Sequence, residues 1–325
     1  FMKDWNQLTE AGKFRRLRPL ALAALEQYDV VPLRLRLVGG FTNAIYRVDT
    51  ADGPLALRID YLQDHPDEST EVELAWLDAL AADTDLDVAR VVQAKDGAST
   101  VYAGAPGVPG ERRCTLFEWI PGKPLEDDMT PERYRQLGQL SAHLRLHGAT
   151  FQPRRRPMEM NTVFYWPDDP LVYHLPDHAR HFTGDRMDLI ERSIATVEPA
   201  FSKLDPAEAQ IIHADLHLWN VHIHRNRMIA LDFEDVAWGH PVQDVAITLF
   251  YGRTHPGYEE LSSAFEEGYR TVAPWPVIYP GELEHFMAGR TLTFINFVLN
   301  LDDEPTDFFE VAFERLRGFL HKWSS

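Results

Sequence analysis

The alternation of hydrophobic and polar positions changes along the chain, and the first third is rich in predicted strands. Short runs of β-branched and aliphatic residues are separated by glycine or proline turns, which is typical of an antiparallel meander. A helix is expected at 68–82, where Trp76, Leu77 and Leu80 recur at helical spacing. The remaining predicted elements are a helix at 17–29 and strands at 33–38, 45–48, 55–59, 88–93, 99–102 and 116–120.

The later part of the chain has mainly helical periodicity. Its first helix is well signalled, because Thr130 suits an N-cap, Pro131 suits the first turn and Gly148 can end the helix. The segment 149–183 has no clear periodicity, and such a long irregular stretch is often a functional loop. The pattern then predicts a helix at 185–203, two strands at 221–224 and 228–231, and mostly helix over 242–325.

These patterns predict an α+β protein with two lobes. We expect a small antiparallel-sheet lobe at 1–118 and a larger, mainly helical lobe at 126–325. The connection at 119–125 contains Pro121-Gly122 and is expected to act as a hinge between the lobes.

Composition narrows the class of protein. The chain has 325 residues with a formal net charge of −18, which argues against a nucleic-acid partner. Its one cysteine, Cys114, excludes an internal disulfide and is expected to be a small buried packing residue. The sequence has no run of about 18 apolar residues and no apolar signal core near Met2, so we expect a cytoplasmic protein without a membrane partner.

The segment from His213 to Asn220 carries the most informative chemistry. Phosphoryl transfer needs a carboxylate beside the acceptor hydroxyl and oxygen ligands for Mg²⁺ at the phosphates. A loop can bring Asp215 and Asn220, five residues apart, to one site, and two short strands would then deliver Asp232 to the same metal. The sequence therefore predicts a phosphotransfer site built on Asp215.

These residues resemble the aminoglycoside phosphotransferase and choline kinase family, which is related to the eukaryotic protein kinases. That family has the pattern H-x-D-x-x-x-x-N, followed by D-F-[DE] and a G-x-P…D-L-A continuation. Here the pattern corresponds to His213, Asp215, Asn220, Asp232-Phe233-Glu234, Gly239-His240-Pro241 and Asp244-Val245-Ala246. The resemblance implies a protein-kinase-like fold, catalysis by Asp215, magnesium ligation by Asn220 and Asp232, and supporting roles for His213 and His217.

The first part of the chain carries the same resemblance, with one departure. The segment Gly39–Ala44 resembles the family's phosphate-covering hairpin, and the strand ending at 120 resembles its hinge. The family usually has lysine on the third strand, where this chain has Arg58. The sequences of this strand, the following helix and the hinge look closest to the bacterial branch that contains the stress-response kinase and type II homoserine-kinase-like proteins. Glu73 is our first choice for the carboxylate that pairs with Arg58, and Glu71 the second. The implied ATP contacts are Gly39, Gly40, Asn43, Arg58, Glu73, Glu118 and Ile120.

The implied activity is an ATP-dependent phosphotransferase with an alcohol acceptor. The expected acceptor is a small molecule such as an aminoglycoside, an amino alcohol or a related metabolite, and the acidic balance slightly favours a cationic one. A Ser/Thr protein kinase, or a nucleotide-binding regulator without turnover (motivated by Arg58 and Trp219), are the alternatives. A histidine-based metal hydrolase is also conceivable, but it leaves Asn220 and Asp232 unexplained. The sequence does not define the oligomeric state.

Overall fold

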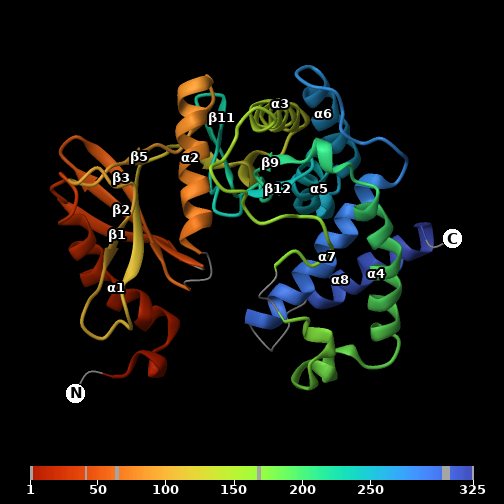
Figure 1. Ribbon diagram of the computed structural model, residues 1–325, viewed down its shortest axis with the longest axis horizontal. Coiled ribbons are helices and arrows are strands. Elements are labelled where there is room, and N and C mark those ends of the chain that lie inside the picture. The colour runs from red at the N-terminus through yellow and green to blue at the C-terminus, as the bar shows by residue number, and fades with distance from the viewer. Residues whose placement is uncertain (1–2, 41, 63–65, 167–169, 302–307, 324–325) are drawn as a thin grey trace. The chain divides into compact units, whose positions relative to one another are not determined.

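The computed structural model describes residues 3–40, 42–62, 66–166, 170–301 and 308–323 (Figure 1). Phe41 of the glycine segment and the acidic run 302–304 lie outside the described residues. The chain forms two compact units, Phe1–Gly122 and Lys123–Ser325. The boundary between them falls inside the segment 119–125 that the sequence predicts as a hinge.

The first unit is built on an antiparallel sheet in the order β1-β2-β3-β7-β5, with β6 also paired to β7. The Gly39-Gly40 pair belongs to β1 and not to a turn, which corrects the predicted strand end at 38; a β-bulge lies between Leu37 and Gly39. The strands of this unit are β1 (Arg34–Gly40), β2 (Asn43–Thr50), β3 (Gly53–Asp60), β4 (Asp87–Val88), β5 (Val91–Val92), β6 (Val101–Ala103) and β7 (Arg112–Glu118).

Two long helices accompany this sheet, α1 (Glu10–Leu25) and α2 (Asp67–Asp83), preceded by the short helix η1 (Trp5–Gln7). Helix α1 begins seven residues before the predicted 17–29, because Thr9 caps a polar first turn by accepting a hydrogen bond from Gly12 N at 3.2 Å. Its apolar face, with Leu17 and Leu20 fully buried, shares one core with Cys114 and the sheet. Burial raises the pKa of the Cys114 thiol to about 12, as suits a packing residue.

The second unit is mainly helical, as predicted. Two short strands absent from the sequence prediction, β9 (Gln210–Ile212) and β12 (Ala237–Gly239), pair with each other. The described part of the segment 149–183 contains two 3₁₀ helices and an isolated β-bridge between Glu159 and Trp238. The helices are α3 (Pro131–Gly148), α4 (Arg186–Ser202), α5 (Pro241–Phe250), α6 (Tyr258–Arg270), α7 (Glu282–Leu301) and α8 (Phe308–Trp323). The strands are β8 (Lys123–Pro124), β9 (Gln210–Ile212), β10 (Val221–His224), β11 (Arg227–Ala230) and β12 (Ala237–Gly239). The 3₁₀ helices are η2 (Leu125–Asp128), η3 (Val172–His174), η4 (Pro176–Phe182), η5 (Pro206–Glu208) and η6 (Tyr251–Thr254).

Helices α3 and α6 cross closely at a pair of glycines. A Cβ on Gly138 would overlap the Phe265 carbonyl, and a Cβ on Gly268 would overlap the Arg135 carbonyl. The backbones therefore touch at this crossing, where any side chain would push the helices apart.

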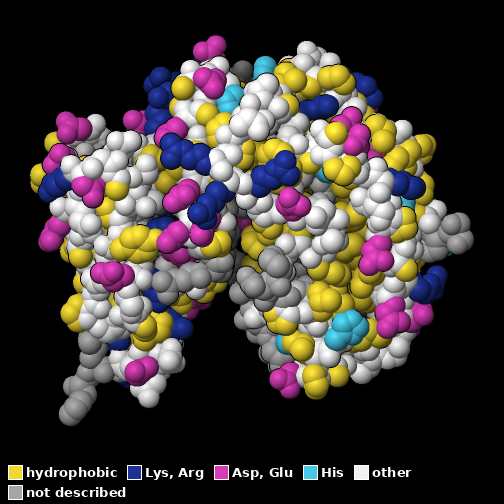
Figure 2. All heavy atoms as spheres, in the orientation of Figure 1, with side chains coloured by type: hydrophobic (Ala, Val, Ile, Leu, Met, Phe, Trp, Pro, Cys, Tyr) yellow, Lys and Arg dark blue, Asp and Glu magenta, His cyan; other side chains and the backbone are white. Residues whose placement is uncertain are grey.

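A separate core joins α4, α7 and α8, with Ile190, Leu292 and Phe313 fully buried at its centre. No helix in the described ranges is long and apolar enough to cross a bilayer. On the face shown in Figure 2, acidic and basic side chains are interspersed over the surface.

Candidate functional site

The loop between β9 and β10 is held by His213. Its Nε2 lies 3.0 Å from the Leu231 carbonyl, and its Nδ1 accepts a hydrogen bond from Asp215 N at 3.3 Å. These partners require the neutral ring with the proton on Nε2. Complete burial lowers the pKa of His213 to about 4, so the ring is neutral at physiological pH. His213 therefore positions the backbone and is not poised to exchange a proton.

A second contact fixes the next residue. Ala214 has a left-handed φ of 62°, and its N–H donates to Asp244 Oδ1 at 2.8 Å. Asp244 belongs to α5 and is buried, which raises the pKa of its carboxyl to about 6. We did not assign this function to Asp244 from the sequence, although the Asp244-Val245-Ala246 run was the available signal.

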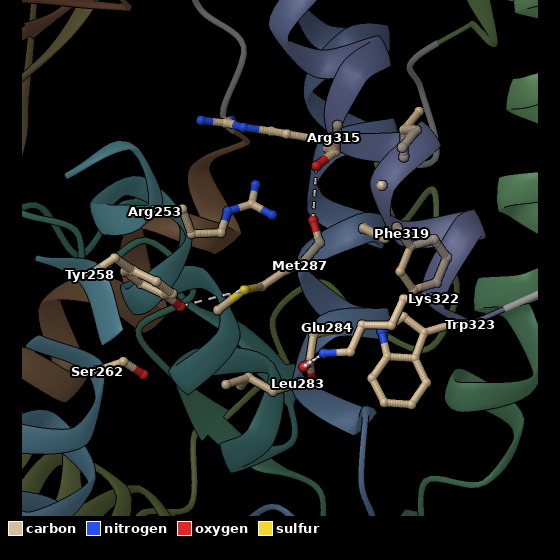
Figure 3. Close-up of a pocket in the computed structure, with 14 residues that line it drawn as sticks. Arg253, Tyr258, Ser262, Leu283, Glu284, Met287, Arg315, Phe319, Lys322 and Trp323 are labelled. Atoms are coloured by element: carbon tan, nitrogen blue, oxygen red, sulfur yellow. Dashed lines mark hydrogen bonds and ion pairs between the residues drawn. The ribbon is translucent and has the colours of Figure 1, made fainter. Parts of the chain in front are cut away.

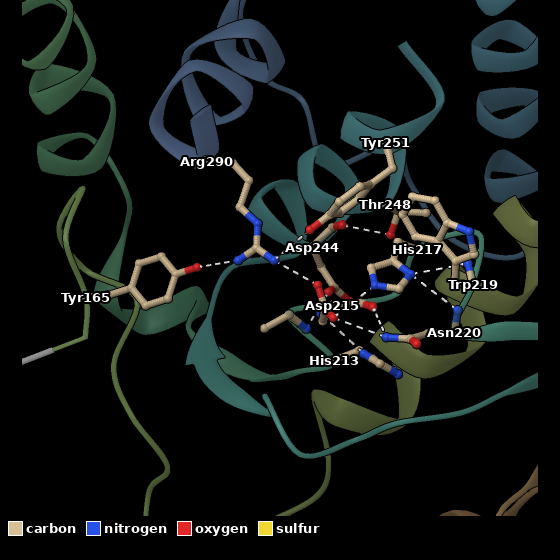
Figure 4. A network of polar contacts seen from close by, with 11 residues as sticks. Tyr165, His213, Asp215, His217, Trp219, Asn220, Asp244, Thr248, Tyr251 and Arg290 are labelled. Atoms are coloured by element: carbon tan, nitrogen blue, oxygen red, sulfur yellow. Dashed lines mark hydrogen bonds and ion pairs between the residues drawn. The ribbon is translucent and has the colours of Figure 1, made fainter. Parts of the chain in front are cut away.

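Asp215 is held by three side chains (Figure 4). Its Oδ1 accepts from Arg290 Nη2 at 2.8 Å; its Oδ2 accepts from His217 Nε2 at 3.2 Å and from Asn220 Nδ2 at 3.1 Å. Burial acts to raise the pKa of Asp215, but His217 and Arg290 outweigh it, and the net pKa is below its ordinary value. The carboxylate is therefore ionised and oriented, with 17% of its side chain exposed.

Arg290 comes from α7 and was not found from the sequence. Besides Asp215, it donates to Tyr165 Oη at 2.7 Å and to Tyr251 Oη at 3.1 Å. Tyr165 lies in the irregular segment 149–183, so that segment does reach the loop. The available signal was a single arginine in a long apolar stretch of α7, because a charged residue at such a position is rarely buried without a partner.

Asn220 and Asp232 are brought together by the strand pair β10–β11. Val221 pairs with Ala230, and Leu231 N donates to Asn220 O at 2.8 Å, so Asp232 follows directly beside Asn220. Asn220 Nδ2 faces Asp215, which leaves its Oδ1 directed away (Figure 4). Asp232 has an unusual φ of 58° for a non-glycine residue, a strain that is often found at functional sites.

This donor set fits Mg²⁺, which prefers hard oxygen ligands and is commonly held by one or two side chains together with substrate phosphates. Within the described part of the chain, no group of three or more His, Cys, Asp or Glu side chains could hold a metal ion. The alternative of a histidine-based metal hydrolase therefore lacks its ligands there.

In the first unit, Arg58 of β3 and Glu73 of α2 form a two-point ion pair. Nη1 and Nη2 of Arg58 lie 2.7 and 2.6 Å from the two carboxylate oxygens of Glu73. Glu73 is 2% exposed in its side chain, whereas Glu71 is exposed, so Glu73 is the partner. The paired geometry suits a planar guanidinium and could not be reproduced by lysine.

The other predicted ATP contacts also lie in the first unit. A Cβ on Gly40 would come within 2.6 Å of the Phe14 ring, whereas a Cβ on Gly39 would meet nothing closer than Ile45 at 4.0 Å. Gly40 is therefore required by packing, and only Gly39 leaves an open backbone face. Asn43 begins β2, close to the glycine pair in the β1–β2 hairpin.

At the predicted hinge, Glu118 ends β7 and its N–H donates to Arg90 O at 2.9 Å. Because the Glu118 N–H is occupied, its carbonyl is the group of the two that remains to accept a hydrogen bond from adenine. Ile120 follows two residues after the end of β7.

An antiparallel-sheet unit followed by a helical unit that carries a half-buried Asp–Asn loop defines a protein-kinase-like α+β fold. A model of the phosphotransferase enzyme family matches residues 34–280, and the chain belongs to that family. Among curated proteins, an uncharacterised protein of Synechocystis is 27% identical over 285 residues, which is 83% of this chain and 75% of the relative.

Solved structures with the same fold include two kinases. Amicoumacin kinase hAmiN, in complex with AMP-PNP and Ca²⁺, matches with a TM-score of 0.77 and 17% identity over 97% of this chain and 96% of its own. A microcompartment-associated aminopropanol kinase matches with a TM-score of 0.74 and 23% identity over 93% and 94%. The family and these neighbours support a phosphotransferase that acts on a small molecule.

Proposed function

We propose that this protein transfers the γ-phosphoryl group of ATP to a hydroxyl of a small molecule, with Asp215 as the catalytic base. The observation that carries the proposal is the state of Asp215: its carboxylate is ionised and held by Arg290, His217 and Asn220. Bound MgATP would supply the phosphoryl group and the charge neutralisation that its transfer needs.

In this scheme Asp215 orients the acceptor hydroxyl and takes its proton as transfer proceeds. A pKa below the ordinary range makes it a weak base, which is sufficient where proton transfer comes late. Asn220 Oδ1 and Asp232 would hold Mg²⁺, and the neutral His213 and the buried Asp244 keep the loop in shape. Arg58, fixed by Glu73, would contact phosphate.

Gly39, Gly40 and Asn43 would cover the phosphates, and the backbone of Glu118 and Ile120 would meet adenine. A Cβ on Gly39 would meet nothing closer than Ile45 at 4.0 Å, and the Glu118 N–H already donates to Arg90 O, which leaves the Glu118 carbonyl for adenine. The neighbour solved with AMP-PNP and Ca²⁺ supports a nucleotide and a divalent ion as cofactors.

The acceptor is proposed to be a small hydroxyl compound, and an amino alcohol is supported by the aminopropanol kinase neighbour. Arg290 disfavours a cationic group directly beside Asp215 because like charges repel. The better place for a cation is beside Trp219, whose Nε1 donates to Glu126 Oε2 at 2.6 Å. A half-exposed indole next to a carboxylate suits an ammonium group.

The test is ADP release with MgATP over aminoglycosides, amino alcohols, homoserine and a protein substrate. Asp215→Ala should lose acceptor-dependent turnover by at least about 10²-fold and still bind nucleotide, because general base catalysis contributes on that scale. Near-normal turnover by that variant would remove Asp215 from the mechanism.

The same assay separates the alternatives. Labelling of a protein target in place of a metabolite would favour the Ser/Thr protein kinase. ATP binding without consumption by any acceptor would favour the regulatory protein without turnover.

A further inference from the structure

A pocket in the helical unit is lined by two half-buried arginines and by none of the side chains around Asp215. It has a volume of about 370 Å³ and lies between η6, α6, α7 and α8 (Figure 3). Arg253 reaches it from η6 and Arg315 from α8. None of the proposed phosphotransfer residues lines this pocket, so the transfer reaction does not account for its two arginines.

Arg253 is held in place but not satisfied. Its Nε donates to Phe250 O at 3.1 Å, and its guanidinium lies 4.1 Å from the centre of the Phe250 ring. Its Nη2 is enclosed by protein and has no hydrogen-bond partner among the described residues. An enclosed donor that carries a positive charge is costly unless a ligand satisfies it.

Arg315 adds a second positive charge against the same ring, 5.5 Å from the centre of Phe250. Burial, followed by repulsion from Arg315, lowers the pKa of Arg253 to about 9, and burial also lowers the pKa of Arg315. Neither arginine forms an ion pair with a carboxylate of the described residues. Glu284, the acidic residue that lines the pocket, lies 3.4 Å from Lys322 Nζ.

The rest of the lining offers hydroxyl groups and apolar surface. Tyr258, Ser262 and Thr291 carry hydroxyls, and Leu283, Phe319 and Trp323 provide the apolar wall. Two guanidinium groups match the two negative charges of a phosphate monoester, and the wall matches an apolar group attached to it.

We propose that this pocket binds a small phosphate monoester, with Arg253 and Arg315 on the phosphate and an apolar portion of the ligand against Phe319 and Trp323. The inference is independent of the transfer reaction, because it rests on residues that the reaction does not use. One structural link joins the two sites, since η6 carries Arg253 and also Tyr251, which contacts Arg290.

The experiment is calorimetric titration of the full chain with phenyl phosphate, inorganic phosphate and benzoate, without Mg²⁺ or nucleotide. Phenyl phosphate should bind most tightly, because it alone has both the double charge and the apolar ring. Arg253→Met and Arg315→Met should each weaken its binding about tenfold or more, since each substitution removes a charge-assisted hydrogen bond to the phosphate.

Two control variants locate the binding. Arg317 lies on α8 like Arg315, but it is paired with Glu314 at 2.7 Å and does not line this pocket. The Arg317→Met variant should therefore bind phenyl phosphate with the affinity of the wild type. Asp232→Asn should also leave binding unchanged, which separates this pocket from the proposed metal site.

Thermal melting without ligand shows whether a variant that loses binding is still folded. Arg253→Met should melt at or above the wild-type temperature, because it removes a buried donor without a partner. The proposal is overturned if phenyl phosphate does not bind the wild type, if it binds no better than benzoate, or if Arg253→Met binds it with unchanged affinity.

Discussion

The carboxylate of Asp215 is surrounded by side chains from two parts of the chain. His217 and Asn220 come from its own loop, and Arg290 comes from a helix 75 residues later. The first two orient one oxygen, whereas Arg290 binds the other and supplies a fixed positive charge. Arg290 is therefore proposed as a positioning residue that sets the proton affinity of the base.

Replacing Arg290 should change the pH dependence of turnover. Transfer requires ionised Asp215, and an opposite charge in contact lowers a carboxyl pKa by about 1–3. Arg290→Met should therefore move the acid limb of the kcat/KM profile to higher pH by about one unit or more. Tyr165→Phe, which removes a hydroxyl contact of Arg290 but no charge, should leave that limb in place. An unchanged acid limb in Arg290→Met would contradict this role.

His213 gives a prediction about stability. Its pKa in the folded protein, about 4, is below the ordinary 6.5, so the unfolded chain binds the proton more readily. The resulting stabilisation is present above pH 6.5 and is lost as pH falls through 4, by up to about 3 kcal/mol. His213→Gln keeps an N–H donor for Leu231 O without titrating in this range. Urea unfolding between pH 7 and pH 4 should show a flatter dependence for the variant; parallel curves would contradict it.

Among the elements, the crossing of α3 and α6 sets the frame of the helical unit. Both helices bring a glycine to the contact, and each glycine lies against the backbone of the other helix. The crossing is therefore specified by the absence of side chains, and a local helix propensity scale would misread these positions as defects.

A pair of glycine substitutions tests that specification. Gly138→Ala should reduce the free energy of unfolding by about 1–3 kcal/mol, because overpacking forces the helices apart. Gly318→Ala on α8 is the matched control: its Cβ would meet nothing within 4 Å, so it should be neutral or stabilise by up to about 1 kcal/mol. Urea unfolding measures both, and a neutral Gly138→Ala would contradict the close crossing.

At the scale of the whole molecule, the proposed nucleotide contacts are divided between two compact units. Arg58, Glu73 and the glycine pair belong to Phe1–Gly122, whereas Asp215, Asn220 and Asp232 belong to Lys123–Ser325. Each unit has its own core, so each could melt separately in the absence of ligand.

MgATP should therefore raise the melting temperature of both units if both bind it. At a hundredfold excess over Kd the stabilisation is about 2.7 kcal/mol. The double variant Arg58→Met/Glu73→Gln removes both charges of the buried pair, so no lone charge remains, and it should lose most of this stabilisation. Asp215→Ala, the control, should keep it. Scanning calorimetry with and without MgATP measures this stabilisation for each variant. Full stabilisation of the double variant by MgATP would contradict the assignment of Arg58 to the nucleotide site.

Local signals in the sequence determined much of this protein. Turn residues and hydrophobic spacing located most strands and helices, and α2 was predicted at 68–82 and found at Asp67–Asp83. The spacing of Asp215, Asn220 and Asp232 needs only a loop and a strand pair, so the motif indicated the family before any long-range contact was known. These signals act within a few residues, where backbone geometry alone relates the side chains.

Tertiary packing decided the rest. The choice of Glu73 over Glu71 depended on which face of α2 is buried, and Glu73 shares that face with Trp76 and Leu77. Gly40 proved to be a packing glycine because Phe14 of a distant helix lies against it.

Two contacts join residues that are far apart in the sequence. Arg290 binds Asp215, and Arg253 and Arg315 both lie close to the Phe250 ring. Periodicity shows that α7 and α8 are helices with an apolar face. Their packing against the loop and against η6 determines that Arg290 of α7 contacts a carboxylate, whereas Arg315 of α8 has none as a partner among the described residues.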